Sequence, residues 1–150
     1  DAPAIGFFQQ YGDFTGNVDR WHYYYLYLPC TAVIDFGSVD TALALPEERR
    51  HEGCQIYALH FMTPVARNYT IDRWMHIRNT AVGDETVAEK MDAMFKIAFE
   101  EDKAILEAIQ VEEEKPKSRL PVRLAIDKGS NVYRKRIDRL IKSELLQLAE

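Results

Sequence analysis

The sequence predicts an α+β fold, an antiparallel sheet with a long helix against it, and two observations support this. Aromatic and β-branched residues fill several short runs in the first half of the chain, as they do in strands. Apolar residues in the second half recur at helical spacing, over residues 84–111 and again over 130–148. Strands followed by helices, rather than alternating with them, are typical of α+β proteins.

The first expected strands lie before residue 37. Residues 5–10 predict a short strand that ends in a turn-rich stretch. The aromatic run over 20–28 is followed by Pro29 and then by a further extended pattern over 31–36. Because proline cannot donate to a strand ladder, Pro29 indicates a bulge or a sheet edge in this region.

A polar stretch over residues 37–53 predicts an exposed loop between the early strands and the later ones. Residues 54–62 are the second strong strand, and residues 69–77 are the third. The turn residues between them predict that these two strands pair as an antiparallel hairpin.

The long helix is expected to begin after Asp84, which has a side chain suited to capping the first turn. At about 100° per residue, its apolar residues fall on one side. That apolar stripe consists of Val87, Met91, Met94, Phe95, Ala98, Phe99, Ile105, Leu106 and Ile109.

An extended segment over 120–126 is expected to lead to the last helix, over about 130–148. The buried stripe predicted for this helix comprises Ile137, Leu140, Ile141, Leu145 and Leu148. Its basic residues, Arg134, Lys135, Arg136 and Arg139, are most simply a solvated face, and an anion site is the alternative.

Length and composition restrict the class of protein. The chain has 150 residues, 47% hydrophobic and 29% charged, enough for one domain with a core. A net charge of −5 argues against a nucleic-acid partner, and no apolar run is long enough to span a membrane. Cys30 and Cys54 lack metal-binding spacing, so they form one disulfide or, more simply, two thiols in a reducing cytoplasm. The start DAPAIGFF, without Met or signal peptide, leads us to expect a fragment of something longer.

Asp102 is the most informative residue, because it lies near the middle of the apolar stripe of the long helix. A carboxylate directed into a core is costly unless it is paired, protonated or bound to a metal. Asp102 therefore pairs with a buried Arg or His, lies as a satisfied polar residue at a rim, or serves as a metal ligand or catalytic acid.

Among four histidines, His60 is the most informative. Side chains alternate along a strand, so Ile56, Ala58 and His60 share one face of the run over 54–62. His60 is either a satisfied core histidine or the one hydrogen-bonding group of a pocket. The sequence leaves the orientations of His22 and His76 open, and it predicts that His51 is solvated in a charged loop.

Four stretches resemble one family in order and spacing. AFEEDKAILEAIQ, over residues 98–110, resembles a helix near the C-terminus of Rieske non-haem iron oxygenase α subunits. HFMTP over 60–64, RN over 78–79 and the segment 120–144 resemble further parts of the same domain. The closest branch contains phthalate dioxygenases, vanillate and dicamba O-demethylases and toluenesulfonate monooxygenases.

The resemblance implies a helix-grip fold (START/Bet v 1-like), in which an antiparallel sheet wraps around a long helix. It implies that Asp102 is the carboxylate ligand of a mononuclear Fe(II), completed by two histidines. It also implies that His60 contacts substrate, that Ile56 and Ala58 form the pocket wall, and that Thr31 is a further, weaker candidate.

The same resemblance implies an enzyme that uses O₂ to hydroxylate, dihydroxylate or O-demethylate an aromatic substrate. Electrons would come from NADH through a reductase or ferredoxin and a [2Fe–2S] Rieske cluster, in a homotrimer. Residues 1–150 contain neither the two-histidine iron motif, the Rieske domain nor the acidic residue that bridges cluster and iron. We therefore expect the chain to be the C-terminal part of the catalytic domain, inactive alone.

A different class of function fits the same fold. A helix-grip domain without metal is a small-molecule binding or carrier module, with Asp102 as a polar group of its cavity. A purely structural oligomerisation piece is a third interpretation.

Overall fold

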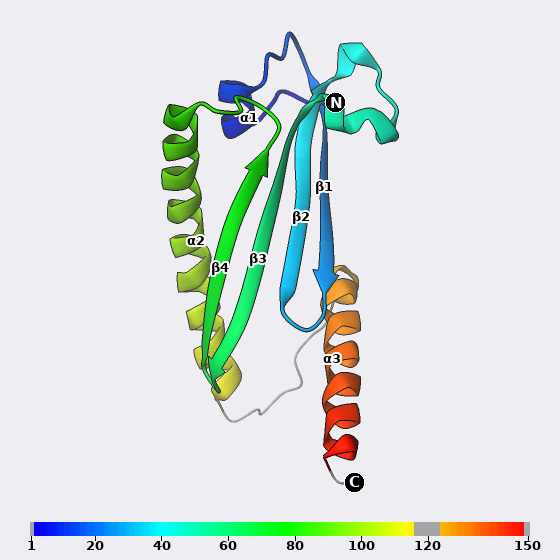
Figure 1. Cartoon of the computed structure of the whole chain (residues 1–150), viewed down its shortest axis with the longest axis vertical. Helices are drawn as coiled ribbons and strands as arrows, with labels where there is room; N and C mark the ends of the chain where they lie inside the picture. Colours follow the sequence, from blue (N-terminus) through cyan, green and yellow to red (C-terminus); the bar gives the residue numbers. More distant parts are fainter. Residues whose placement is uncertain (1, 116–123, 149–150) are drawn as a thin grey trace. The chain divides into compact units, whose positions relative to one another are not determined.

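The computed structural model describes residues 2–115 and 124–148 of the chain, as an α+β fold (Figure 1). The helices and strands are α1 (Gly6–Tyr11), β1 (Val18–Tyr27), β2 (Thr31–Asp40), β3 (Cys54–Ala66), β4 (Tyr69–Arg78), α2 (Glu85–Glu114) and α3 (Lys128–Gln147). Three short 3-10 helices, η1 (Thr41–Leu43), η2 (Glu47–Glu52) and η3 (Ala125–Asp127), lie between them. The chain divides into two compact units, residues 1–82 with 129–150 and residues 83–128.

The sheet belongs to the first unit, and its order β1-β2-β3-β4 follows the sequence (Figure 1). All three strand pairs are antiparallel, and the predicted hairpin of β3 and β4 is confirmed. Pro29 was expected at a bulge or edge; it lies instead in the turn that joins β1 to β2, where Tyr27 pairs with Thr31. A turn accommodates a proline because no ladder hydrogen bond is needed there.

The register assigns side chains to two faces, because directly paired residues point to the same side and neighbours alternate. The side that we call the His60 face carries His22, Tyr24, Ala32, Ile34, Phe36, Ile56, Ala58, His60, Asp72, Trp74 and His76. The opposite side, the Asp35 face, carries Trp21, Tyr23, Tyr25, Thr31, Val33, Asp35, Gln55, Tyr57, Leu59 and Phe61.

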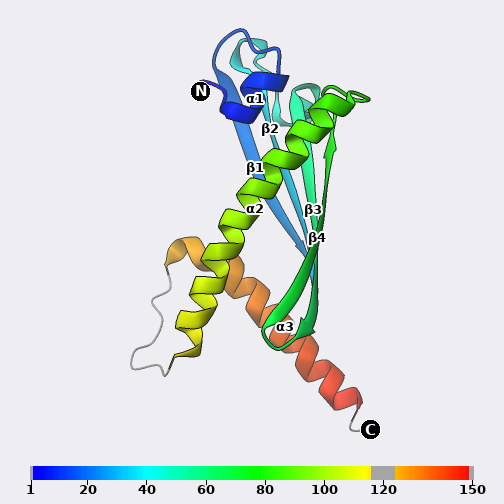
Figure 2. The same cartoon turned by 90° about the vertical axis from the view of Figure 1, so that its left-hand side faces the viewer.

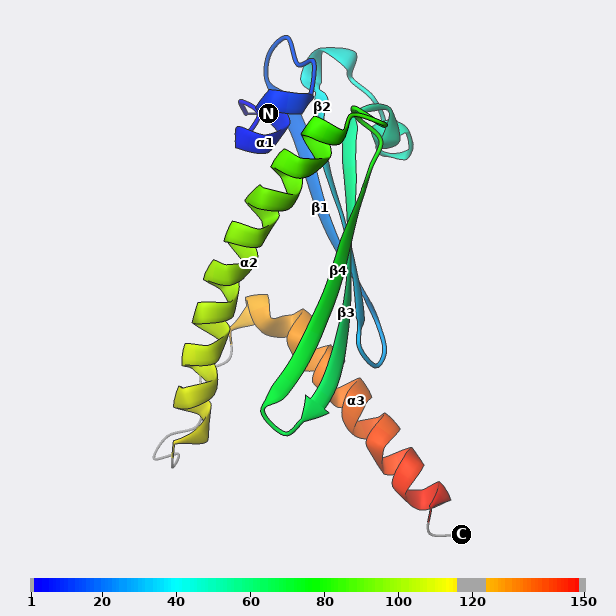
Figure 3. The ribbon, with the colours of Figure 1, turned by 60° about the vertical axis from the view of Figure 1, so that its left-hand side comes forward.

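The strand expected at residues 5–10 is wrong, because Gly6–Tyr11 forms helix α1. Ala4 and Phe8, four residues apart, are both buried, a spacing that a helix and a strand share. Phe8 meets Phe36 edge to face, with ring centroids 6.0 Å apart. Figures 2 and 3 show α1 at the end of the sheet where β1 begins. A run this short fits both periods, so the contact with Phe36 decides.

The loop expected over 37–53 is partly wrong, since β2 continues to Asp40 before η1 and η2 begin. Gly37 permits β2 to continue, because it has no side chain at a crowded position. A Cβ on Gly37 would come within 2.5 Å of the Trp21 ring and of the Cys54 carbonyl oxygen. A residue without a side chain therefore lets Trp21 cross β2 on the Asp35 face.

Helix α2 forms as predicted, with the Asp84 side chain accepting a hydrogen bond from the Val87 backbone N–H at 3.2 Å. Within its apolar stripe, Met91 is buried and Phe95 and Phe99 stack 6.1 Å apart. Further along, Ile105 and Leu106 are 59% and 64% exposed. None of the described helices has the length and apolar composition needed to cross a membrane.

Two expectations near the C-terminus need correction. The extended segment 120–126 lies partly outside the described residues, and its described end enters η3, where the Leu124 N–H donates to Asp127 Oδ2 at 2.8 Å. The stripe predicted as buried on α3 is instead exposed beyond the half-buried Ile137. The start of α3 is anchored by the Tyr133 hydroxyl, which donates to the Pro29 carbonyl at 2.5 Å. Periodicity alone did not ensure that the later stripe residues are buried. The four basic residues of α3 are exposed, as expected of a solvated face.

Both cysteines are free thiols, Cys54 buried and Cys30 half-buried, so the alternative of a disulfide between them is not formed. Burial raises the pKa of the Cys54 thiol, although a hydrogen bond with Thr80 opposes the shift.

Candidate functional site

The predicted pocket residues of β3 lie together on the His60 face. Ile56 and Ala58 are buried, and the His60 side chain is 14% exposed. Their partners on β2 are Phe36, Ile34 and Ala32, in that order. The floor beside His60 is therefore apolar, and two of its residues, Ala32 and Ala58, are small.

Strand β4 adds polar and aromatic groups to the same face. Trp74 pairs with His60, and His76 pairs with Ala58. The rings of Trp74 and His76 lie 5.2 Å apart. The sequence left His76 and His22 unoriented, and the register now places both on this face. On the far side of the floor, His22 stacks on Tyr24 and contacts Phe36, and burial lowers the pKa of its imidazole.

The fourth candidate, Thr31, is not brought to this place. It pairs with Tyr27 and Phe61, so it lies on the Asp35 face of the sheet. One residue of displacement along a strand reverses the side of the sheet, which is why Thr31 and its neighbour Ala32 face opposite ways.

Asp102 lies near the middle of the apolar stripe of α2, and its side chain is exposed. The stripe residues that follow it are also exposed. Because the apolar neighbours of Asp102 are as uncovered as the carboxylate, its exposure does not distinguish a rim residue from a ligand. Asp102 belongs to the compact unit of residues 83–128 and His60 to the other, so the role of Asp102 as an iron ligand stays a prediction.

A carboxylate oxygen is a suitable ligand for Fe(II), but one carboxylate does not make a site. Within residues 2–115 and 124–148, no three His, Cys, Asp or Glu side chains are placed to hold a metal ion together. Asp102 would therefore contribute one ligand of a set completed by other groups.

The His60 face is chemically suited to an aromatic ligand. Apolar side chains from β2 and β3 provide surface for a ring, and the imidazole and indole groups of His60, His76 and Trp74 provide polar edges. Ligand sites typically combine a mostly apolar lining with a few placed polar groups.

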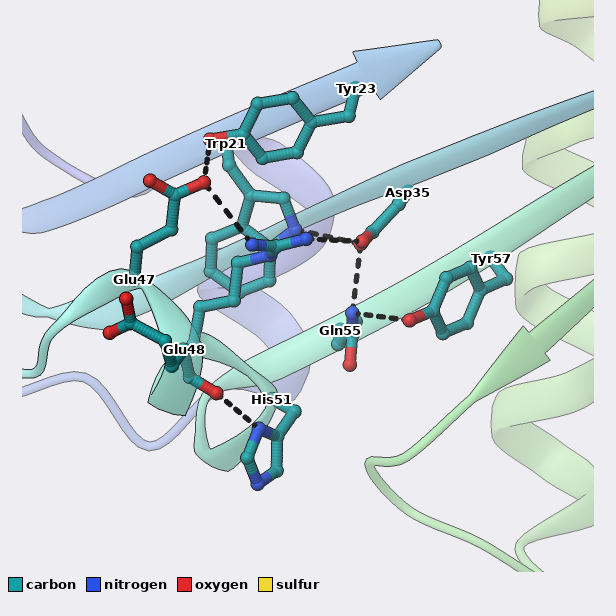
Figure 4. Close-up of polar contacts among 9 residues, drawn as sticks. Trp21, Tyr23, Asp35, Glu47, Glu48, His51, Gln55 and Tyr57 are labelled. Carbon is teal, nitrogen blue, oxygen red and sulfur yellow. Dashed lines mark hydrogen bonds and ion pairs between the residues drawn. The ribbon is translucent and has the colours of Figure 1, made fainter. Parts of the chain in front are cut away.

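The Asp35 face carries a polar network that sequence reasoning missed (Figure 4). Asp35, 2% exposed, accepts hydrogen bonds from Trp21 Nε1 at 2.8 Å, Gln55 Nε2 at 2.8 Å and Arg50 Nη2 at 3.0 Å. Gln55 Nε2 also donates to the Tyr57 hydroxyl at 3.0 Å. The sequence did contain a signal for this network. Asp35 is an acid inside a predicted strand, just as Asp102 is an acid inside the apolar stripe of a predicted helix.

Arg50 links this network to η2. It donates to Glu47 Oε1 at 3.3 Å, and its guanidinium lies 4.8 Å from the centre of the Tyr23 ring. Burial alone would raise the pKa of the Asp35 carboxyl, but hydrogen bonds from Gln55, Trp21 and Arg50, with the charge of Arg50, lower it below the ordinary value. Fully paired and buried, Asp35 holds η2 to the sheet and is a structural group.

Comparison with known proteins agrees with these features. The family model of the vanillate O-demethylase oxygenase C-terminal domain matches residues 1–143. A toluene-4-sulfonate monooxygenase system iron–sulfur subunit of Comamonas testosteroni is 35% identical over 136 residues, which is 87% of this chain and 38% of that protein. A second subunit of that organism, provisionally given the same name, is 34% identical over 132 residues, with the same coverage of each chain.

No solved structure matches the chain. The chain spans 38% of the length of the two curated relatives. The match to the family model covers the four strands, α2 with Asp102 and most of α3. With its antiparallel sheet, its long helix and this match, the chain belongs to the family of vanillate O-demethylase oxygenase C-terminal domains, and it corresponds to the C-terminal portion of a Rieske-type oxygenase.

Proposed function

We propose that residues 1–150 form the C-terminal part of the catalytic domain of a Rieske-type aromatic oxygenase. The observation that carries the proposal is the family match across the chain together with Asp102, an acid in the apolar stripe of α2. The relatives are named as subunits of a monooxygenase system, and the family as an O-demethylase. We infer hydroxylation, dihydroxylation or O-demethylation of an aromatic substrate.

In this proposal Asp102 is the carboxylate ligand of a mononuclear Fe(II), and two histidines outside residues 1–150 complete the set. When bound, the iron supplies the activation of O₂. Asp102 contributes negative charge that offsets the charge of the cation, and helix α2 holds it on a rigid element.

His60, Ile56 and Ala58 form the substrate site in this proposal. The apolar floor binds an aromatic ring, and His60 forms a hydrogen bond with a polar substituent. The family is named for vanillate and the relatives for toluene-4-sulfonate, and both compounds are aromatic rings with an acidic group. We therefore infer an aromatic acid as the substrate class. The register does not support Thr31 as part of this site.

The remaining parts of the proposal follow from relatives named iron–sulfur subunits of a monooxygenase system. We propose a [2Fe–2S] Rieske cluster outside residues 1–150, a reductase or ferredoxin that delivers electrons from NADH, a homotrimeric assembly and a cytoplasmic location.

The test uses the complete protein, meaning this chain with whatever segments accompany it in the native polypeptide. Asp102→Asn keeps the size of the side chain and removes its charge. We expect loss of mononuclear iron and of product formation, with the visible absorption of an iron–sulfur cluster retained. Iron per chain by mass spectrometry, the visible spectrum and turnover of toluene-4-sulfonate and vanillate are the measurements.

Asp92→Asn is the matched control, because Asp92 is an exposed acid of the same helix, paired with Lys96. It should retain iron and turnover. Full iron content and normal turnover in Asp102→Asn would contradict the assignment. The alternative of a metal-free binding module is not favoured by the monooxygenase relatives, and it predicts no iron dependence at all.

A further inference from the structure

A carboxylate on β4 contacts the histidine of the proposed substrate site. Asp72 Oδ2 lies 2.7 Å from His60 Nδ1. His60 pairs with Trp74, and Asp72 is two residues before Trp74, so the two side chains are diagonal neighbours on one face. Such neighbours are within reach of long or aromatic side chains. The contact thus follows from the register of β3 and β4.

The chemistry of this contact fixes the position of one proton on His60. A carboxylate only accepts hydrogen bonds, so Nδ1 of His60 must be the donor. The acid group of the proposed substrate also only accepts, so His60 must donate to it from a protonated Nε2. The ring plane is also restricted, because Nδ1 must point at Asp72. Nε2 is then the nitrogen through which His60 meets a ligand.

Burial differs between the two partners. The His60 side chain is 14% exposed and that of Asp72 is 41% exposed. An ion pair this accessible contributes little to stability. The contact is therefore better suited to orienting the ring than to holding the sheet together. Carboxylates orient metal-binding histidines in the same manner.

Resting on the function proposed above, we propose that Asp72 is a positioning residue for substrate binding: it accepts a hydrogen bond from Nδ1 of His60 and so directs Nε2–H toward the acid group of an aromatic acid. Asp72 itself does not touch the substrate. Its effect on binding passes through His60.

The first measurement does not depend on any ligand. Crystal structures of the complete protein and of its Asp72→Asn and Asp72→Ala variants report the ring of His60. We expect one orientation in the wild type and in Asp72→Asn, whose amide oxygen still accepts from Nδ1. Asp72→Ala should release the ring into other rotamers. An unchanged His60 in Asp72→Ala would overturn the proposal.

The second measurement is a double-mutant cycle with toluene-4-sulfonate and vanillate as probes. Asp72→Ala should weaken probe binding by about 2–12-fold, the effect of one ordinary hydrogen bond, and raise KM more than it lowers kcat. Asp72→Asn should recover most of this loss. In the His60→Ala background, Asp72→Ala should have no further effect. An equal effect in both backgrounds would overturn the proposal.

Thr70→Ala is the matched control, an exposed position of the same strand and the same face. It should change neither readout. The outcomes separate the two proposals. If His60→Ala binds both probes as the wild type does, the substrate site is wrong, whereas the crystal structures still decide whether Asp72 orients His60.

Discussion

Each face of the sheet carries a carboxylate that contacts side-chain nitrogen atoms, but the two carboxylates have different roles. On the Asp35 face, Asp35 is buried and accepts from Trp21, Gln55 and Arg50. On the His60 face, Asp72 is two-fifths exposed and meets the imidazole of His60. A buried charge is tolerated only when it is fully paired, so Asp35 is committed to the fold. The accessible Asp72 carries no such structural commitment, and it can orient His60 for binding.

The first prediction tests whether Asp35 is structural. Asp35→Ala should lower the free energy of unfolding of the complete protein by about 3–5 kcal/mol, because it leaves Arg50 and two neutral donors without their acceptor. Denaturant titration measures the change. Asp13→Ala, an exposed acid, should stay within about 0.5 kcal/mol of the wild type. Equal effects at both positions would remove the distinction between the two faces.

The second prediction concerns the space beside the network. Gly37→Ala should destabilise by about 1–3 kcal/mol, because the added Cβ meets the Trp21 ring and the Cys54 carbonyl. Gly129→Ala is the comparison, since a Cβ there meets nothing within 4 Å and alanine favours the helix α3. Thermal melting should shift in opposite directions for the two variants. If the melting temperatures of both variants shift in the same direction, the close approach at Gly37 is relieved without loss of stability, which would contradict the prediction.

The third prediction uses pH. The pKa of Asp35 is lower in the folded protein than its ordinary value of 3.8, so its ionised form stabilises the fold. That stability is fully present above the unfolded pKa and is lost as the pH falls through the folded pKa. The stability difference between the wild type and Asp35→Asn, measured by denaturant titration, should therefore shrink below about pH 4. A difference that stays constant down to pH 2.5 would contradict it.

The smallest expected effect on stability is that of His60→Ala. We expect a loss of about 0.5–1.5 kcal/mol, because the imidazole makes an accessible hydrogen bond rather than a buried one. Binding of toluene-4-sulfonate or vanillate should fall in the same variant. Denaturant titration and binding titration are compared on one preparation. Large destabilisation with unchanged binding would make the His60 face structural and the comparison of the faces wrong.

The site could be predicted from the sequence only as far as local periodicity reaches. Alternation alone placed Ile56, Ala58 and His60 on one face, and that placement is confirmed. Alternation cannot say which residues of other strands lie beside them. Asp72, Trp74 and His76 join His60, and Thr31 does not, because of pairing between distant segments.

By itself, the sequence determined the α+β class, the strands of the later hairpin and the helix α2 with its cap at Asp84. These depend on side-chain spacing along the chain, which is a local property. Only the tertiary structure decided that Gly6–Tyr11 is helical, that β2 continues past Gly37 and that Asp35 lies under Arg50. Each of these depends on a contact with a segment far along the chain, and such contacts are set by register and packing rather than by local pattern.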